Sequence, residues 1–437
     1  MPTIRLSAIP DLFSLCASNP EAFPVLLETA AGAGWHILFA YPQTLQRYTV
    51  DQGADFFQNL DDDWQQARAA KNDDTAHLPF RGGWFVYLGY EMLHTLEPSV
   101  ANRAVLDNNF PVAVFMRVPA AVMVNNHTRE AWLFAESAAL LSQLQHDIAH
   151  TPPVSLPELA LKSLAEEPAT YFLDSVVQIQ RYIAAGDVFQ VNLSRRWRGR
   201  VSKANSAMGL YHALRHNNPA PFAGIANLGH DQFIISSSPE RLVQVVDDHA
   251  LTRPIAGTHP RHADPEQDRQ IRDALLAHPK ERAEHVMLVD LERNDLGRVC
   301  VPGSVKVDEL MVVASYQHVH HIESTVSGQL KPSVSPLDVV RALFPGGTIT
   351  GCPKVRTMQI IRELESTPRG AYTGSMGYIN LDGDFDLNIL IRTMMLSGQE
   401  LEFSAGAGIV VDSDPDRELG ETRAKAKGLL RALGLAQ

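Results

Sequence analysis

Two sets of glutamates are spaced so that each set would lie on one face of a helix. Residues 279–296 contain no helix breaker after the first position, and the run ends at Gly297; proline is well tolerated at the first position of a helix. Glu281 and Glu284 share a face of this helix because residues three apart are neighbours on its surface. The second set follows the helix-start signal Asp414-Pro415 and consists of Glu418, Glu421 and Lys425.

Four carboxylates that met in a polar cleft would suit a hard divalent cation. Mg²⁺ takes about six oxygen ligands, commonly one or two carboxylates directly and the others through ordered water. A pair of glutamates on one helix is also what a solvated surface carries, where charge pairs are common and contribute little. The spacing therefore predicts two acidic helix faces, and a magnesium site only if the two faces meet.

Three segments rich in glycine carry backbone N–H groups that could bind an anion. Residues 344–354 (FPGGTITGCPK) lead into a predicted helix, whose N-terminus would favour negative charge. The side-chain donors of this segment are Thr348, Thr350 and Lys354. The other two segments, interpreted as loops after strands, are 254–258 and 404–408. Each is also an acceptable turn, and 344–354 lacks the GK[ST] ending of a phosphate-binding loop, so a carboxylate ligand fits equally well.

The elements that would position these residues are mostly short strands in hairpin order. Apolar runs between turn signals predict strands over 35–40, 82–87, 112–116, 120–124, 131–134, 232–236, 241–246, 375–381, 389–396 and 401–404. Helical spacing predicts helices over 136–150 and 172–185. The proline-rich stretch 151–168 predicts a linker between a region over 1–150 and a region over 169–437. Hairpin clusters separated by helices favour an antiparallel α+β fold over a doubly wound parallel sheet.

Composition restricts the class of protein. The 437 residues include 50 Asp and Glu against 38 Lys and Arg, a net charge of −12, which argues against nucleic acid as the main partner. No stretch approaches the ~18 to 20 apolar residues of a membrane span, and residues 1–20 lack a signal-peptide pattern. The three cysteines fit neither a disulfide framework nor a zinc site. We expect a soluble, cytoplasmic protein that binds neither nucleic acid nor membrane.

Eight motifs resemble the chorismate-utilising enzymes in order and spacing. They are SPER (238–241), PIAGT (254–258), KERAEHVMLVDLERND (280–295), HHIES (320–324), FPGGTITGCPKVR (344–356), GY (377–378), IRT (391–393) and GAGIVVDSDPDRELGETRAK (406–425). The family comprises anthranilate, aminodeoxychorismate, isochorismate and salicylate synthases. The resemblance is strong over about 172–433, the catalytic region, and looser over 1–150. It implies a single large αβ sandwich of two antiparallel β-sheets with surrounding helices, and a Mg²⁺-dependent chorismate site between the sheets.

The resemblance also implies roles for individual residues. Glu284 and Glu421 resemble direct metal ligands, and Glu281 and Glu418 resemble the pair that binds metal-bound water. The residues that resemble catalytic groups are Glu240, His321, Gln190 and Thr258 of PIAGT. Of these, Glu240 resembles the acid near the departing C4 hydroxyl. The residues that resemble contacts to the two substrate carboxylates are Thr348, Tyr372, Arg392, Gly406, Gly408 and Lys425.

The chemistry of chorismate agrees with these roles. Chorismate is a dianion, so a cation must offset the repulsion between its ring carboxylate and the glutamates, while Arg392 can bind the other carboxylate in a bidentate way. Hydroxide is a poor leaving group without protonation. Glu240 should therefore keep a raised pKa, as a carboxyl among other carboxylates does.

Three positions indicate which reaction the resemblance implies. Isochorismate and salicylate synthases carry a lysine, the base for an attacking water, where this chain has Gln190, so ammonia is the expected nucleophile. Residues 190–194 (QVNLS), 344–354 and 371–375 (AYTGS) resemble aminodeoxychorismate synthase component I, a transferase of para-aminobenzoate and folate biosynthesis that takes nitrogen from glutamine or ammonia. Some of these enzymes carry a reactive lysine at the position of Ala256. Anthranilate synthases have alanine at this position, as this chain does. Anthranilate synthase component I, which releases anthranilate and pyruvate, is therefore the alternative.

The source of ammonia and the regulation are also part of the expectation. The chain has no glutaminase nucleophile motif, so the resemblance implies a separate glutamine amidotransferase subunit as partner. Residues 26–29 (LLET) resemble the LLES stretch that binds feedback tryptophan in anthranilate synthases, and we interpret them instead as part of a buried helix. A non-catalytic subunit that binds chorismate or tryptophan is a further alternative. It is disfavoured because all the acidic positions and His321 are present.

Overall fold

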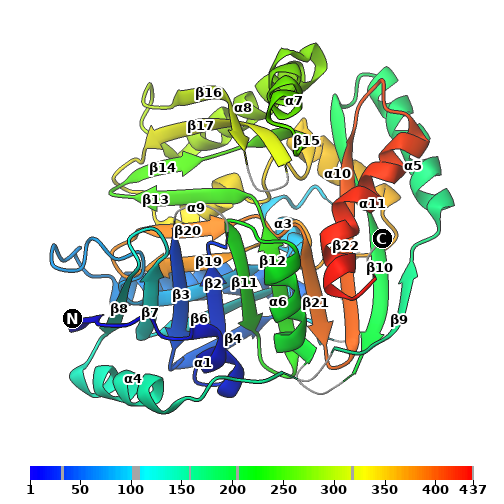
Figure 1. Ribbon diagram of the computed structural model, residues 1–437. Coiled ribbons are helices and arrows are strands. Elements are labelled where there is room, and N and C mark those ends of the chain that lie inside the picture. Colours follow the sequence, from blue (N-terminus) through cyan, green and yellow to red (C-terminus); the bar gives the residue numbers. More distant parts are fainter. Residues whose placement is uncertain (31–33, 101–108, 157–158, 203–205, 316–318, 436–437) are drawn as a thin grey trace.

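Two large antiparallel sheets face each other and form the centre of the computed structural model (Figure 1). The structure describes residues 1–437 except 31–33, 101–108, 157–158, 203–205, 316–318 and 436–437. In spatial order the first sheet is β1 (Thr3–Leu6), β8 (Glu130–Ala135), β7 (Ala120–Asn125), β3 (Trp35–Ala40), β2 (Val25–Glu28), β11 (Phe222–Asn227), β12 (Gln232–Ser238), β21 (Thr393–Ser397), β22 (Glu400–Ile409), β10 (Gln190–Val201) and β18 (Gly351–Cys352). Strand β9 (Leu161–Glu166) pairs with the far end of β10.

The second sheet follows the same antiparallel pattern. In spatial order it is β15 (Ile255–Pro260), β17 (Val319–Gln329), β14 (His249–Thr252), β13 (Arg241–Val246), β20 (Phe385–Asn388), β19 (Ser375–Asn380), β5 (Gly83–Leu88), β6 (Ala113–Val118) and β4 (Thr44–Tyr48), with β16 (Lys306–Ser315) also on β17. The predicted antiparallel α+β class and the two-sheet sandwich are confirmed.

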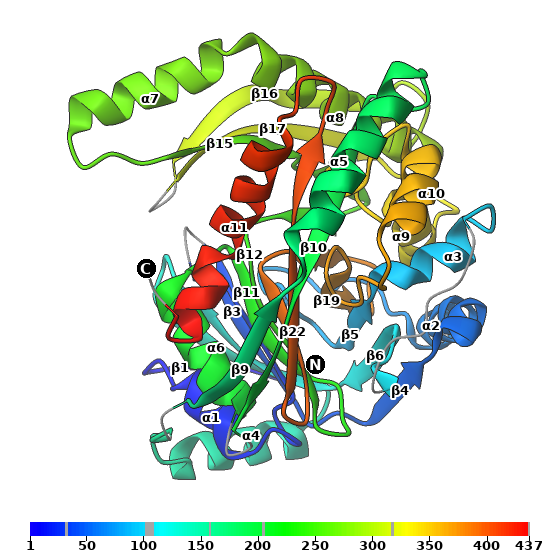
Figure 2. The same cartoon turned by 90° about the vertical axis from the view of Figure 1, so that its right-hand side faces the viewer.

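Helices cover the outer faces of the sandwich. They are α1 (Leu12–Ser18), α2 (Gly53–Ala67), α3 (Leu93–Leu96), α4 (Ala138–His150), α5 (Ala169–Ala184), α6 (Ser206–Asn217), α7 (Pro265–Ala277), α8 (Pro279–Val299), α9 (Pro336–Leu343), α10 (Lys354–Leu364) and α11 (Pro415–Ala432), with 3₁₀ turns η1 (Val50–Gln52) and η2 (Tyr90–Met92). Figure 2 shows α5 and α11 beside the long strands β10 and β22. Within the described residues, no helix combines the length and apolar character that a membrane crossing would need.

Alternation along β5 shows how the layers pack. Phe85 and Tyr87 point between the sheets, where they meet Phe39 and Met376. The intervening side chains of β5, Trp84 among them, lie on the other face with residues of α2 and α9. Successive residues of a strand point to opposite faces, so a strand that is apolar at every position is buried on both sides.

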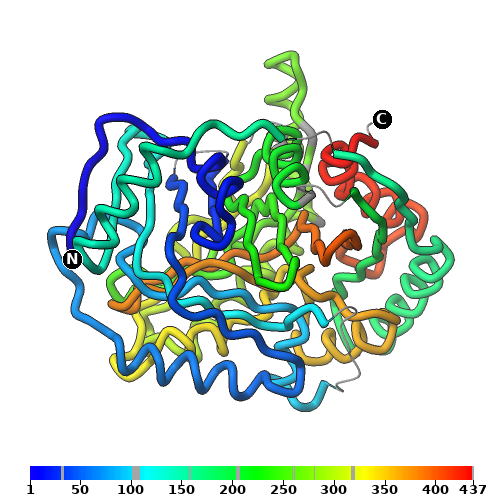
Figure 3. Tube along the Cα trace, turned by 90° about the horizontal axis from the view of Figure 1, so that it is seen from below, coloured from blue at the N-terminus to red at the C-terminus, as the bar shows by residue number. Residues whose placement is uncertain are grey.

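Strands from 1–150 and from 169–437 pair with each other in both sheets. Strand β2 pairs with β11, and β5 pairs with β19; Figure 3 shows the same interleaving from below. The proline-rich stretch 151–168 includes strand β9, which pairs with β10. The stretch 151–168 therefore separates two regions of the sequence, but each sheet contains strands from both regions.

The predictions for four segments are wrong. Residues 26–29 are not helical: Leu26, Leu27 and Glu28 belong to strand β2. The glycine-rich residues 404–408 lie inside β22, and most of 254–258 lies in β15, so neither segment is a loop. The strand predicted over 389–396 begins only at Thr393, because Arg392 has a φ of 52°, in the left-handed region that interrupts a strand.

Candidate active site

The predicted substrate contacts gather where β10, β22 and β18 meet. Gln190 pairs with Cys352 of β18, and Asn192 pairs with Gly408 of β22. Lys425 of α11 reaches the same strand, since its Nζ donates to the Gly406 carbonyl oxygen at 3.0 Å. The α11 start signal is confirmed: Asp414 accepts a hydrogen bond from the Arg417 backbone. The sheet end and the helix therefore place these groups together.

The two glycines of β22 lie very close to neighbouring site residues. A Cβ on Gly408 would lie 2.3 Å from Nε2 of Gln190, and a Cβ on Gly406 would lie 2.7 Å from both Oδ1 of Asn192 and the Tyr372 hydroxyl. Glycine is the residue that permits such a close approach. Gln190, Asn192 and Tyr372 thus cluster around the backbone of β22, and Asn192 is a site residue that the sequence prediction did not single out.

Arg392 provides a cation whose guanidinium has no hydrogen-bond partner among the described residues. It makes no ion pair with any residue that the structure describes either. Burial lowers the pKa of Arg392, and the nearby Glu240 acts in the opposite direction. A partly buried guanidinium with five unused donors is suited to a carboxylate, which it can bind with two parallel hydrogen bonds.

Glu240 is a buried carboxyl close to these cations. It is 5% exposed, and its pKa is raised from 4.5 to about 7, chiefly by burial and in part by the charge of Glu323. Lys425 and Arg392 lower the pKa in part. The raised value was expected, but desolvation, rather than neighbouring carboxylates, is its main cause.

Four side-chain atoms at the site have no hydrogen-bond partner among the described residues, and two of them are Oε1 of Gln190 and Oδ1 of Asn192. Neither Oε1 of Glu240 nor Oγ1 of Thr348 has a hydrogen-bond partner among the described residues, although the Thr348 hydroxyl is near enough to lower the pKa of Glu240. Buried polar groups are normally satisfied. Orphaned groups next to an unpaired guanidinium indicate a site built for a polar ligand.

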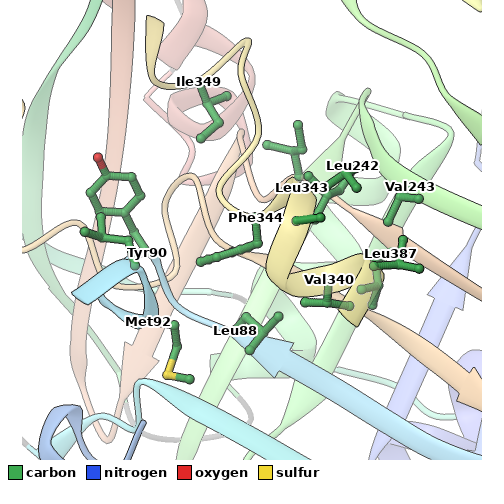
Figure 4. Packing of buried hydrophobic residues seen from close by; sticks show 14 of the residues in the cluster. Leu88, Tyr90, Met92, Leu242, Val243, Val340, Leu343, Phe344, Ile349 and Leu387 are labelled. Carbon is green, nitrogen blue, oxygen red and sulfur yellow. The ribbon is translucent and has the colours of Figure 1, made fainter. Parts of the chain in front are cut away.

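The anion-binding segment 344–354 offers fewer donors than predicted. Lys354 pairs with Asp295 at 2.7 Å and donates to the Leu343 carbonyl, and the Thr350 hydroxyl is buried and donates to the Gly346 carbonyl at 3.0 Å. Both therefore serve the structure, and Thr348 remains. The neighbouring Phe344 and Ile349 fix the segment by packing in the apolar cluster of α9 and β13 (Figure 4).

His321 lies in β17 and is neutral at pH 7. Its pKa is lowered to about 4, chiefly by burial and in part by the charge of Arg392. Its Nδ1 lies 3.2 Å from the Gly257 carbonyl oxygen, which can only accept, so Nδ1 carries the proton and Nε2 is the acceptor nitrogen. The Thr258 backbone pairs with His321, but the Thr258 side chain lies outside the described residues.

The four predicted metal-binding glutamates lie on the two predicted helices. Glu418 is buried and accepts from Ser413 at 2.8 Å, while Glu421 is 46% exposed and pairs with Lys425 at 2.8 Å. On α8, Glu281 lies against β15, since Oε2 is 2.9 Å from the Cβ position of Gly257. No three His, Cys, Asp or Glu of the described ranges lie close enough to hold a metal ion. The donor chemistry suits Mg²⁺, but the two pairs are not assembled into one site.

Glu292 is another buried carboxyl near Glu240, and the sequence prediction missed it. It is 6% exposed, and burial raises its pKa to about 8, with contributions from Asp295 and Glu240. The buried face of α8 also includes His285 and Leu288. Residues 285, 288 and 292 are spaced three and four apart, as on one face of a helix. This spacing could have predicted that Glu292 is buried.

A cavity of about 550 Å³ lies beside this site and is lined in part by Leu27, Glu28, Arg241 and Glu323. The Glu28 carboxylate is already bound by the Tyr211 hydroxyl and by Arg215, whose Nη2 lies 2.7 Å away. Leu27, Glu28 and Thr29 therefore form part of the wall of this cavity, while Leu26 packs in a separate apolar cluster.

Neutralising Glu240 should stabilise the protein in a pH-dependent way. The folded state holds the Glu240 proton up to about pH 7, whereas its ordinary pKa is 4.5, so stability falls as the pH rises through this window. Glu240→Gln removes that loss and should raise the free energy of unfolding by roughly 3 kcal/mol at pH 8.5, and by much less at pH 5. Urea unfolding at both values tests this; a difference that does not depend on pH would contradict it.

Comparison with known proteins places these residues in context. A family model described as chorismate binding enzyme matches residues 23–431. An anthranilate synthase component I-like protein from Synechocystis is 43% identical over 82% of this chain and 74% of its own length. Aminodeoxychorismate synthase component 1 from Bacillus subtilis is 41% identical over 82% and 78%. The crystal structure of anthranilate synthase component I from Streptococcus pneumoniae matches with a TM-score of 0.80 at 31% identity, over 90% of this chain and 92% of that one.

Proposed function

The chain belongs to the chorismate binding enzyme family, and from this premise we propose that it aminates chorismate at C4 to give 4-amino-4-deoxychorismate. The observation that carries the proposal is the unpaired guanidinium of Arg392 beside the buried carboxyl of Glu240, whose pKa is raised to about 7. The first group suits a substrate carboxylate, and the second can give up a proton near neutral pH. The product serves para-aminobenzoate and folate biosynthesis.

The reaction needs a leaving group and a nucleophile. Glu240 gives its proton to the C4 hydroxyl, the C4–O bond breaks and water leaves, and the lone pair of ammonia forms the C4–N bond. The proton that the new amine loses returns to the Glu240 carboxylate, so chorismate and ammonia give aminodeoxychorismate and water. Arg392 and Lys425 orient the two carboxylates of the substrate, and neutral His321 contributes a hydrogen bond without adding charge.

Gln190 supports ammonia as the nucleophile. Its side-chain Oε1 is buried without a partner in the described part of the chain, and an amide can accept a hydrogen bond from ammonia but cannot deprotonate water. Ammonia would come from a glutamine amidotransferase subunit or from solution. Because Ala256 carries no amine, no covalent intermediate forms at that position and ammonia attacks the ring directly.

Mg²⁺ is part of the proposal. Glu284 and Glu421 would bind it directly, and Glu281 and Glu418 would hold its water ligands. When bound, the ion supplies positive charge that offsets the repulsion between the substrate's ring carboxylate and these glutamates. Glu421 pairs with Lys425 at 2.8 Å in this structure, and a metal ion on Glu421 would compete with that contact.

Anthranilate synthesis is the second candidate. Two observations favour it: Ala256 stands where some aminodeoxychorismate synthases have lysine, and residues 27–29 line a cavity next to the site where a tryptophan could bind. The Glu28 carboxylate, however, is already occupied by Tyr211 and Arg215. The motifs around Asn192 and residues 344–354 favour the first candidate.

A turnover assay tests whether the chain is an enzyme. The purified chain is incubated with chorismate, MgCl₂ and ammonium at mildly alkaline pH, and then with an amidotransferase subunit and glutamine. We expect chorismate to disappear only when Mg²⁺ and a nitrogen source are both present. Chorismate that binds but persists in both assays would instead support a non-catalytic subunit.

Glu421→Gln should remove the Mg²⁺ dependence. Loss of one direct ligand should weaken Mg²⁺ binding, measured by calorimetry with chorismate present, by at least about tenfold and should abolish turnover. Glu400→Gln is the matched control, because Glu400 is 50% exposed and pairs with Arg200 at 2.8 Å far along β22. Normal Mg²⁺ binding and turnover by the Glu421 variant would refute the metal assignment.

A further inference from the structure

Arg369 is a buried arginine whose five N–H donors are all used. It is 3% exposed and follows α10. Its Nε and Nη2 donate to the two carboxylate oxygens of Glu365 at 2.8 and 2.7 Å. Its other hydrogen bonds go to Ile349 O at 3.0 Å, Asn192 O at 2.7 Å and Thr373 Oγ1 at 3.3 Å. A guanidinium has five donors in a fixed plane, so this environment matches arginine completely.

The three segments that Arg369 binds are those that carry site side chains. Ile349 follows Thr348, and Thr373 follows Tyr372, whose ring centroid lies 5.6 Å from the guanidinium carbon. Asn192 donates from Nδ2 to the Thr348 carbonyl at 3.3 Å. One side chain therefore links strand β10, the 344–354 segment and the Tyr372 turn.

Carboxylates fix this arginine from two sides. Oε1 of Glu365 also accepts from the Ser194 backbone at 2.8 Å, which attaches the pair to β10. Glu91, from the 3₁₀ turn η2, accepts from the backbone N–H groups of Arg369 and Gly370 at 2.8 and 3.0 Å. Glu365 thus fixes the guanidinium of Arg369, and Glu91 fixes its backbone.

We propose that Arg369 is a positioning residue for the chorismate site: it contacts no substrate, but its hydrogen bonds set the relative placement of Thr348, Tyr372 and Asn192. This inference rests on the proposed function. A displacement of about 1 Å among groups that orient a substrate can cost about 10²-fold in rate. Lysine keeps the charge, but its three donors on one nitrogen cannot reproduce the five planar contacts.

The test compares Arg369→Lys with Arg81→Lys in the full chain. Arg81 is 6% exposed. It pairs at 2.7 Å with both Asp382 and Asp384, which lie in the turn between β19 and β20. The control variant therefore also loses a buried arginine that pairs with carboxylates, but at a place away from the site. For each variant we would measure thermal unfolding, the stoichiometry of chorismate binding by calorimetry, and kcat and KM.

We expect Arg369→Lys to bind one chorismate per chain and to lose about 10²-fold in kcat with KM changed less than about fivefold, because Arg392 and Lys425 still bind the carboxylates. Arg81→Lys should keep kcat within about threefold even where it unfolds at a lower temperature. A normal kcat for Arg369→Lys, or an equal loss for Arg81→Lys, would overturn the inference. Wild-type protein that neither binds nor consumes chorismate would overturn the proposed function and this inference with it.

If Arg369→Lys binds chorismate at much less than one per chain, Glu365→Gln decides the question. Glutamine keeps the shape of the partner but removes its charge, which should tilt the guanidinium without emptying its place. A loss of about tenfold in kcat with full binding stoichiometry would support positioning. An unchanged kcat would overturn it.

Discussion

Exchange of Arg392 for methionine should lower kcat/KM for chorismate by about 10³-fold, because the substrate carboxylate loses a bidentate, charge-assisted contact and must be bound beside the buried Glu240 without a cation. The same exchange should leave the free energy of unfolding unchanged or higher. Arg392 has no hydrogen-bond or ion-pair partner in the described structure, so its removal breaks no native contact of that kind. Steady-state kinetics and urea unfolding of one preparation provide both numbers.

Arg47→Met is the matched control for this variant. Arg47 donates to the carbonyl oxygens of Leu228 and Gly229 at 2.7 and 2.8 Å, and it lies at the edge strand β4. The control should lose stability but keep kcat/KM within about threefold. The reverse pattern, in which the Arg392 variant loses stability and keeps its activity, would show that Arg392 is structural.

Glu240→Gln should lower kcat by about 10³-fold and leave the dissociation constant for chorismate within about threefold. General acid catalysis typically contributes 10²- to 10⁴-fold, and glutamine keeps the size of the side chain but cannot release a proton to the C4 hydroxyl. Rapid-quench turnover combined with calorimetric binding separates the two quantities.

Glu28→Gln controls for the loss of a buried carboxyl. Glu28 is 5% exposed and is bound by Tyr211 and Arg215, so this variant should lose stability but keep kcat. Substantial turnover by the Glu240 variant would transfer the role of acid to another group, and Glu292 would be the next buried carboxyl to test.

The sequence predicted best what local rules determine. The Asp414-Pro415 start of α11 and the shared stripe of Glu421 and Lys425 follow from capping and helical spacing, and both are present. The hairpin order of the strands predicted the antiparallel class in the same way, because alternation and turn residues are local signals.

Contacts distant in sequence were beyond such rules. Lys354 was a candidate anion donor, but it pairs with Asp295, 59 residues earlier. Gly406 and Gly408 were placed in a loop because glycine is common in turns, yet the adjacent strand β10 incorporates them into β22. The residues around Arg392 do not predict its left-handed backbone conformation. This conformation excludes Arg392 from the strand that was predicted over 389–396.

The identity of the product tests the central claim most directly. The purified chain is incubated with chorismate, MgCl₂ and ammonium, and the reaction is stopped within a few turnovers for mass spectrometry, with pyruvate measured in parallel. We predict 4-amino-4-deoxychorismate with its pyruvyl group retained and no free pyruvate. Anthranilate with an equal amount of pyruvate would contradict the account and place amination at C2.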